Sequence, residues 1–284
     1  MIDQETIAER IRNDMHLFTP TERKAAHVLL ANYPIAGLET VAEFARRANV
    51  SAPTVLRFVA RLGFAGYPEF QRALRDELDQ QGQSPLAKAR FADASGPARE
   101  GPLGGFAAAL AGNLTETFRH VPPAEFEAVV ALLSDPRRVV HTLGGRLSDP
   151  LAGYLAAHLK VVRPHVGHVS GQSANWRDHL LDMGSRDVLV LLDIRRYQDD
   201  LTAFAAAAGE RGVTVLLFTD QWLSPIARHA RHVLSARVAV PSRWDSMTAL
   251  LGLVEAVIAA VTETSGEAGE RRIALLDAMR AAGA

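Results

Sequence analysis

No cysteine occurs among the 284 residues of the chain. Its absence excludes a disulfide scaffold, a thiolate metal site and a cysteine nucleophile, and it fits the reducing cytoplasm. An excess of positive charge is lacking too, because 31 lysines and arginines face 32 aspartates and glutamates. With a formal net charge of −1, any surface that binds nucleic acid must be confined to one part of the chain.

Long hydrophobic runs are also missing. The most apolar stretch, residues 247–261, is interrupted by Glu255, and a membrane span needs about 20 mostly apolar residues. The first ten residues include Asp3, Glu5 and Glu9, where a secretion signal would have a basic and then an apolar region. We therefore expect a cytoplasmic protein that makes no contact with membranes.

Signatures of common catalytic sites are absent. The sequence has neither a phosphate-loop lysine motif nor a nucleophile elbow. His165 and His168 stand three residues apart, but this pair lacks the further ligands of a metal site. We expect no catalytic residue, no metal and no cofactor.

Composition along the chain predicts two domains. Apolar residues make up 48% and charged residues 22%, as in ordinary globular proteins, and a domain usually takes about 100–200 residues. Residues 79–105 are rich in Gln, Gly, Pro and Ser and read as a linker, with a short helical piece near residues 86–91. The expected units are a domain at 1–78, the linker, and a domain at 106–284.

The second domain alternates short apolar runs with helical stretches. Strands are expected at 138–143, 166–170, 187–193, 212–219 and 233–240, and helices at 148–162, 201–209 and 245–261. A continuous apolar run such as 187–193 is typical of a strand buried in a parallel sheet. The pattern predicts an α/β fold with a doubly wound parallel sheet, which binds ligands at the carboxyl ends of its strands.

The first domain contains a helix-turn-helix pattern at residues 40–64. Thr40 and Ser51 are suited to cap two short helices, and Asn49 between them tolerates a left-handed conformation. The N-terminal residues of the second helix would read base edges in the major groove of DNA. The candidate DNA-binding residues are Ser51, Ala52, Pro53, Thr54, Arg57 and Arg61.

Local charge supports this interpretation. Residues 40–75 hold six arginines and two glutamates, so this segment carries a net charge of +4. Arginine can bond guanine through two hydrogen bonds, and serine or threonine can bond bases or phosphates. The alternative is a solvated helical hairpin that binds no DNA.

Four motifs carry a resemblance to a known family. They are T-P-T-E-R-K at 19–24, A-x-x-A-N-V-S at 45–51, T-V-x-R-F at 54–58 and R-L-G-F-x-G-Y at 61–67. With them, residues 17–77 resemble the N-terminal domain of RpiR-type transcriptional regulators. The resemblance implies a regulator that binds double-stranded operator DNA.

Members of that family carry a C-terminal sugar isomerase (SIS) domain, which residues 139–148, 184–193 and 210–227 resemble. The turn after the first strand is also informative by itself. Gly144 and Gly145 allow a tight bend, and the following helix offers free N–H groups to an anion. Arg146 could add a charge and Ser148 a hydroxyl group. The alternative is a tight turn that binds nothing.

The loop after the central strand departs from the family pattern. SIS domains that bind sugar phosphates usually carry S-x-S-G there, whereas residues 193–200 read D-I-R-R-Y-Q-D-D, a variant found in a subset of RpiR-type regulators. Arg195 and Arg196 could hold a phosphate or carboxylate. They could instead pair with nearby aspartates, namely Asp193, Asp199 or Asp220. Ser246 is a further candidate ligand contact, with helix capping as the alternative.

These observations predict a DNA-binding regulator whose SIS-like domain senses a small anionic metabolite, phosphorylated or carboxylated. We expect a homodimer or homotetramer, because one recognition helix buries too little surface for selective binding, and apolar helix faces such as 250–258 would join the subunits. A sugar-phosphate isomerase with a helical appendage is the rival, and it would need a positioned acid–base pair. A third possibility is a pocket that binds nothing and serves assembly.

Overall fold

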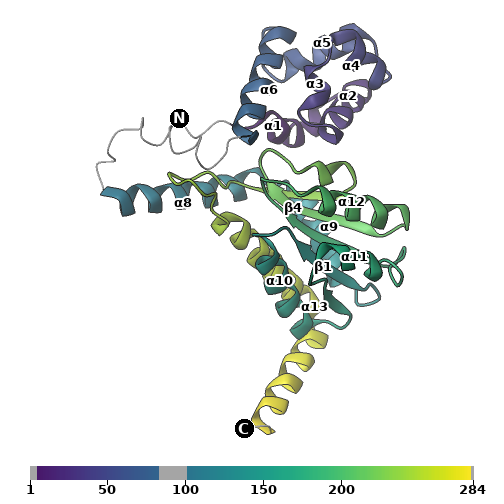
Figure 1. Cartoon of the computed structure of the whole chain (residues 1–284), viewed down its shortest axis with the longest axis vertical. Coiled ribbons are helices and arrows are strands. Elements are labelled where there is room, and N and C mark those ends of the chain that lie inside the picture. Colours follow the sequence, from purple (N-terminus) through teal and green to yellow (C-terminus); the bar gives the residue numbers. More distant parts are fainter. Residues whose placement is uncertain (1–4, 83–100, 283–284) are drawn as a thin grey trace.

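The computed structural model describes residues 5–82 and 101–282, which form a helical domain and an α/β domain (Figure 1). The helical domain is built from seven elements: α1 (Ile7–Asn13), η1 (Met15–Leu17), α2 (Pro20–Ala31), α3 (Ile35–Leu38), α4 (Val41–Arg47), α5 (Ala52–Arg61) and α6 (Tyr67–Gly82). Its core combines aliphatic side chains with aromatic ones, of which Phe44, Phe58 and Phe70 are fully buried. This separate cluster of apolar side chains makes it an all-α unit.

Local sequence explains where these helices begin and end. The Thr19 hydroxyl group accepts the Glu22 N–H, while the Glu22 carboxylate accepts the Thr19 N–H. These two reciprocal hydrogen bonds form a capping box at the N-terminus of α2. The Thr40 hydroxyl group caps α4 by accepting the N–H of Glu43. Asn49 adopts φ 50° in the turn before α5, and Gly63 adopts φ 85° after it. The predicted helix-turn-helix is therefore present as α4 and α5.

The α/β domain has five strands, all parallel, in the order β2-β1-β3-β4-β5. They are β1 (Val140–Gly144), β2 (Val166–His168), β3 (Val188–Asp193), β4 (Thr214–Asp220) and β5 (His232–Ala236). Every residue of β3 is buried, because helices cover both faces of the sheet. The predicted doubly wound α/β fold is confirmed.

Two apolar cores lie on the two faces of this sheet. On one face pack α9 (Pro123–Ser134), α10 (Asp149–Val162) and α13 (Thr248–Ala282), and on the other α11 (Ser173–His179) and α12 (Asp199–Glu210). Alternate residues of β3 point to opposite cores, Val190 to the first and Leu191 to the second. A 3-10 turn, η2 (Pro225–Arg228), follows β4.

Some boundaries differ from those expected. Helix α6 continues to Gly82 and α8 (Gly101–His120) begins before residue 105, so both ends of the expected linker are helical. The helical piece expected near 86–91 lies outside the described residues. The last helix extends about 20 residues beyond the predicted end at 261. It does so across a kink at Gly266, which has φ 47° and ψ −139°.

Helix α13 is long and apolar enough, by composition, to cross a membrane. Its first half is nevertheless a core helix, because Leu250, Leu253, Val254 and Val257 are fully buried against the rest of the domain. These four residues of the stretch 250–258 are covered by the domain's own core, and the expectation that this stretch joins two subunits stays a prediction.

Candidate DNA interface and effector pocket

The recognition helix α5 exposes an outward stripe. Pro53, Leu56, Arg57, Ala60 and Arg61 are exposed, at the spacing of residues on one face of a helix. Ala52 is half-buried at the first helical position. Ser51 is the exposed N-cap, but its hydroxyl group lies 2.9 Å from Oγ1 of Thr54 and makes no bond to the helix backbone. The predicted residues thus divide into an exposed set and an inner set.

Thr54 belongs to the inner set. Its side chain is 5% exposed and its hydroxyl group accepts a 3.2 Å hydrogen bond from Nη2 of Arg57. Thr54 is therefore placed to orient Ser51 and Arg57, and a direct contact of its hydroxyl with a base does not fit this geometry. Arg57 itself remains exposed and reaches solvent from the outward face.

Arg61 is tied to the neighbouring helix. Its Nη1 donates to the Leu17 carbonyl at 3.1 Å, and its Nε lies 3.4 Å from Oε2 of Glu22. Burial opposes ionisation of Glu22, but hydrogen bonds from Thr19 and the charge of Arg61 lower the pKa of its carboxyl group. The Arg61 side chain is still 46% exposed, so it can approach a phosphate.

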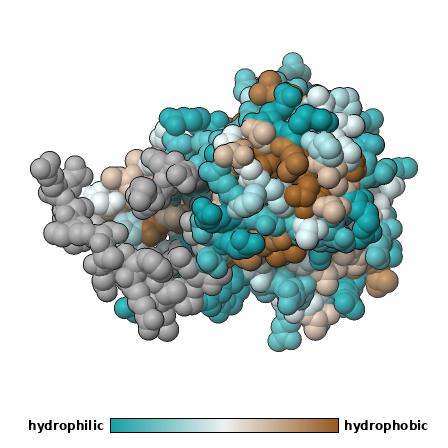
Figure 2. All heavy atoms as spheres, turned by 90° about the horizontal axis from the view of Figure 1, so that it is seen from above, coloured by the Kyte–Doolittle hydropathy of each residue, from teal (hydrophilic) through white to brown (hydrophobic). Residues whose placement is uncertain are grey.

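From the sequence, Leu56 was expected to point into the core together with Val55 and Val59, and this expectation is wrong. It is 46% exposed in the middle of the recognition helix, and Figure 2, seen from the side of this domain, shows apolar side chains on an otherwise hydrophilic face. The helical spacing of 53, 56, 57 and 60 was a signal that could have found it. An exposed leucine there is suited to contact a thymine methyl group.

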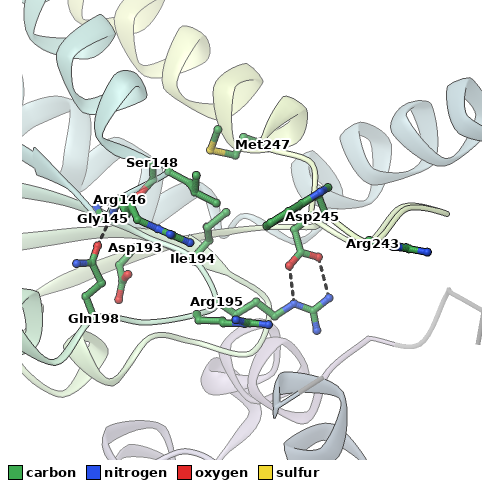
Figure 3. A pocket seen from close by; sticks show the side chains of 13 residues that line it. Gly145, Arg146, Ser148, Asp193, Ile194, Arg195, Gln198, Arg243, Asp245 and Met247 are labelled. Carbon is green, nitrogen blue, oxygen red and sulfur yellow. Dashed lines mark hydrogen bonds and ion pairs between the residues drawn. The ribbon is translucent and has the colours of Figure 1, made fainter. Parts of the chain in front are cut away.

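The second candidate site is a cavity of about 470 Å³ at the carboxyl ends of β1 and β3 (Figure 3). The order β2-β1-β3 reverses at this point, where doubly wound sheets leave a crevice. Predicted residues that line it are Gly145, Arg146, Ser148, Arg195 and Arg196. Lining residues that the sequence reasoning missed include Leu147, Asp193, Gln198, Arg243, Trp244, Asp245 and Met247.

The turn at Gly144 and Gly145 requires glycine because a side chain would clash there, and neither residue has a positive φ. A Cβ at Gly144 would lie 2.4 Å from the amide nitrogen of Asp149, so no side chain fits there. The N–H groups of this turn already donate to acceptors of the chain: Gly144 to Asp149 Oδ1 at 3.0 Å, Gly145 to Ser148 Oγ at 3.0 Å, and Arg146 to Gln198 Oε1. Gly144 does not line the cavity, and the expected cradle for an anion is occupied by these acceptors.

Arg195 is not available as an anion receptor. Its Nε and Nη2 donate to the two carboxylate oxygens of Asp245, both at 2.8 Å, and its guanidinium group lies 3.7 Å from the ring centroid of Trp222. The side chain is 4% exposed. The predicted role of Arg195 in effector binding is therefore wrong, because its side chain links the loop after β3 to the segment before α13. Arg196 is exposed at the rim.

Ser246 has a structural role at the start of α13. Its hydroxyl group donates to Thr248 Oγ1 at 3.0 Å and accepts the Thr248 N–H, so it supports the start of α13 and does not line the cavity. Glu255 accepts a 3.2 Å hydrogen bond from Tyr154 on an exposed surface and is also outside the cavity.

Two buried aspartates end neighbouring strands. Asp193, at the end of β3, is 1% exposed, and burial raises the pKa of its carboxyl group to about 7. Asp220, at the end of β4, accepts the Arg195 N–H at 2.7 Å and the Tyr197 hydroxyl at 2.6 Å. Burial likewise raises the pKa of Asp220.

The residue after Asp220 touches the DNA-binding domain. The backbone carbonyl of Gln221 accepts a 3.4 Å hydrogen bond from the Thr6 hydroxyl group, and its side chain accepts the Val238 N–H at 3.3 Å. Beside it, Nη2 of Arg237 lies 2.7 Å from Oε2 of Glu9. Helix α1 is therefore docked on the α/β domain next to the loop that carries Asp220.

Comparison with known proteins identifies both parts. A helix-turn-helix domain of the rpiR family matches residues 5–81, and a SIS domain matches residues 132–260. The regulator HexR of Pseudomonas aeruginosa is 29% identical over 224 residues, 78% of this chain and 75% of HexR. HexR of Escherichia coli is 26% identical over 241 residues, 84% of this chain and 79% of that protein.

Solved structures show the same folds. The sugar isomerase domain of an RpiR transcription factor from Sphaerobacter thermophilus is 25% identical, with a TM-score of 0.57 over 62% of this chain and 97% of that one. The NanR protein of Vibrio vulnificus, in complex with ManNAc-6P, is 18% identical, with a TM-score of 0.53 over 96% of this chain and 97% of that one. With both domains matched in this order, the chain belongs to the RpiR-type family of DNA-binding transcriptional regulators that carry a SIS domain.

Proposed function

We propose that this regulator binds a small anionic metabolite in the cavity between β1 and β3, and that the occupied and empty states differ in DNA affinity. The observation that carries the proposal is a set of three exposed arginines around the cavity: Arg146, Arg196 and Arg243. Within residues 5–82 and 101–282 their side chains have no recorded hydrogen bond or ion pair. Uncommitted guanidinium groups are suited to hold a phosphate or a carboxylate.

The docked helix α1 supports a route from the cavity to the DNA-binding domain. A ligand that moves the Arg195–Arg196 loop acts on Asp220, because Asp220 accepts hydrogen bonds from that loop. The next residue, Gln221, contacts Thr6 at the start of α1. Such a ligand regulates DNA binding provided that it binds one arrangement of the domains more tightly than the other.

The proposed effector is an anion that carries either a phosphate or a carboxylate group. The NanR structure contains a sugar phosphate, which is a property of that protein. Here residues 193–200 lack the S-x-S-G hydroxyl groups and carry two arginines and a tyrosine, and Arg195 is held by Asp245. We therefore do not restrict the effector to sugar phosphates.

We also propose a cytoplasmic homodimer or homotetramer. A single recognition helix buries little surface, and two-fold symmetry would present two helices to paired half-sites. The exposed apolar residues of α8, namely Leu103, Phe106 and Phe118, favour α8 as a contact between subunits in place of the buried face of α13.

Catalysis is not part of the proposal. The carboxylates that line the cavity are Asp193 and Asp245, and Asp245 is held by both hydrogen bonds of Arg195. An isomerase would need a second positioned acid or base, which the lining residues of this cavity do not supply. Turnover of glucose 6-phosphate or arabinose 5-phosphate by the purified chain would favour the isomerase alternative.

The test combines ligand and DNA binding by the full chain. The shift in melting temperature with glucose 6-phosphate, inorganic phosphate, gluconate and neutral glucose identifies the class of effector. The affinity for DNA is then measured with and without the effector, on DNA selected from a random pool by the full chain. We expect stabilisation by at least one anion, loss of that effect in Arg243→Ala, and its retention in Arg271→Ala, a control arginine exposed on α13. Stabilisation by glucose alone, or anion binding unchanged in Arg243→Ala, would refute this site.

A further inference from the structure

Asp193 lies at the floor of the cavity with one oxygen unsatisfied. Its Oδ2 accepts a hydrogen bond from the Ser224 hydroxyl group, whereas Oδ1 has no hydrogen bond of normal geometry among the described residues, although the Gln198 backbone N–H lies nearby. The side chain is 1% exposed and lines the cavity. A buried carboxylate oxygen without a hydrogen bond raises the free energy of the folded protein. A ligand donor that bonds this oxygen therefore gains more binding free energy than it would at the surface.

The surroundings of Oδ1 disfavour an anion. A Cβ at Gly145 would lie 3.3 Å from Asp193 Oδ1 and 3.0 Å from Gln198 Oε1, which shows that both acceptors crowd this corner. Asp199 and Asp200 begin α12 directly beyond Gln198. A phosphate placed here would face oxygen acceptors of the chain and negative charge. This end of the cavity therefore suits a hydrogen-bond donor.

Arg243 lies across the cavity from Asp193. Figure 3 shows Arg243 on the side opposite Asp193 and Gln198, with the Arg195–Asp245 pair between them, whereas Arg146 lies on the same side as Gln198. Apolar side chains, including Ile194 and Met247, line the space that separates the two ends. A ligand that satisfies both ends must carry an anionic group at one end and a donor at the other.

We propose that Asp193 is a specificity-determining residue that accepts a hydrogen bond from a hydroxyl or ammonium group of the effector, whose anionic group faces Arg243. The inference rests on the proposed function and adds to it the orientation and chemical class of the ligand. The effector is then a hydroxylated or aminated acid or phosphate. A simple anion or an apolar acid lacks the group that Asp193 recognises.

Matched ligands test this in the full chain. Affinity is measured by calorimetry for hexanoate, 6-hydroxyhexanoate and 6-aminohexanoate, and for hexyl phosphate against glucose 6-phosphate. At pH 8.5, above the pKa of about 7 of Asp193, we expect the member with a donor to bind the parent protein at least about tenfold more tightly than its partner, as for a hydrogen bond to a charged group. Because this comparison needs no variant, it does not depend on how a substitution folds.

Variants then assign the effect to Asp193. In Asp193→Asn and Asp193→Ser the advantage of the donor-bearing ligand should fall below twofold, while the partner without a donor binds as before. Asp199→Asn, an exposed control at the start of α12, should keep the full advantage. Arg243→Ala should weaken both members of a pair equally.

The outcomes separate this inference from the proposed function. Equal affinity within every pair, or an advantage that survives both Asp193 variants, overturns the role of Asp193 while binding through Arg243 still stands. If no member of any pair binds the parent protein, the proposed effector site and the role of Asp193 are both refuted.

Discussion

Glu9 of α1 and Arg237, which follows β5, form a buried ion pair between the two domains. Nη2 of Arg237 lies 2.7 Å from Oε2 of Glu9, and their side chains are 8% and 4% exposed. The same Glu9 oxygen accepts the backbone N–H of Thr6 at 2.8 Å and so closes the cap of α1. One carboxylate therefore holds the first helix together and attaches it to the effector domain.

The pair predicts that Arg237→Met destabilises the docked arrangement by about 3–5 kcal/mol, because the substitution leaves a buried carboxylate without its cation. Urea unfolding of the full chain, followed by limited proteolysis near α1, measures the effect. Arg271→Met, which breaks the exposed pair with Glu267, is the matched control and should leave the midpoint unchanged. Equal effects of the two substitutions would show that the Glu9–Arg237 contact does not hold the domains.

Arg57 is predicted to read a base. Arg57→Ala should weaken binding to a selected operator by about 1–3 kcal/mol and leave binding to random DNA nearly unchanged. Fluorescence anisotropy with both DNAs measures this. Unchanged operator affinity would remove Arg57 from the reading surface.

Arg61 is predicted to contact a phosphate. Its guanidinium group is held at the edge of α5 by Leu17 and Glu22, so Arg61→Ala should weaken binding to all sequences alike. The slope of log affinity against log salt should fall by about 1. Titration at several salt concentrations is the measurement, and a loss confined to the operator would contradict the assignment.

The sequence predicted the helices of the DNA-binding domain well, because the residues that begin and end each helix lie close together in the sequence. Thr40 caps through Glu43, three residues away, and Asn49 takes its positive φ within the turn itself. Helix α1 was not predicted, although Thr6 and Glu9 form a capping box. Its contact with the α/β domain includes Arg237, more than 200 residues later, which no local pattern reveals.

The effector site was predicted in place but not in detail. Glycines and arginines at the ends of β1 and β3 indicated the crevice, because parallel strands bring their carboxyl ends together. Arg195 pairs with Asp245, 50 residues away, and the Gln198 side chain accepts the backbone N–H of Arg146, 52 residues away. Such pairings depend on tertiary geometry, so the sequence could not distinguish a bound arginine from an available one.

Stability should decrease as the pH rises from about 4 to about 7. Burial raises the pKa of Asp193 from 3.8 to about 7 and that of Glu77 from 4.5 to about 7. The folded state then binds protons that the unfolded state has released, so the stability contributed by these two groups is fully present below about pH 4 and is lost as the pH rises through about 7. Each pKa unit corresponds to about 1.4 kcal/mol.

Asp193→Asn and Glu77→Gln should each flatten this profile, because they remove one of the two titrating groups. Urea unfolding at pH 4, 5.5, 7 and 8.5 measures it, with Asp199→Asn as the exposed control. A stability difference between the parent and each of these two variants that stays constant over that range would contradict the raised pKa values.

Selection of DNA from a random pool by the full chain, with Arg57→Ala in parallel, tests the central claim most directly. For a regulator that reads DNA through α5, the parent should enrich one motif, made of two half-sites related by two-fold symmetry, and Arg57→Ala should lose base preference within each half-site. Failure of the parent to enrich any motif, or the same motif enriched equally by Arg57→Ala, would contradict the assignment of α5 as the reading helix.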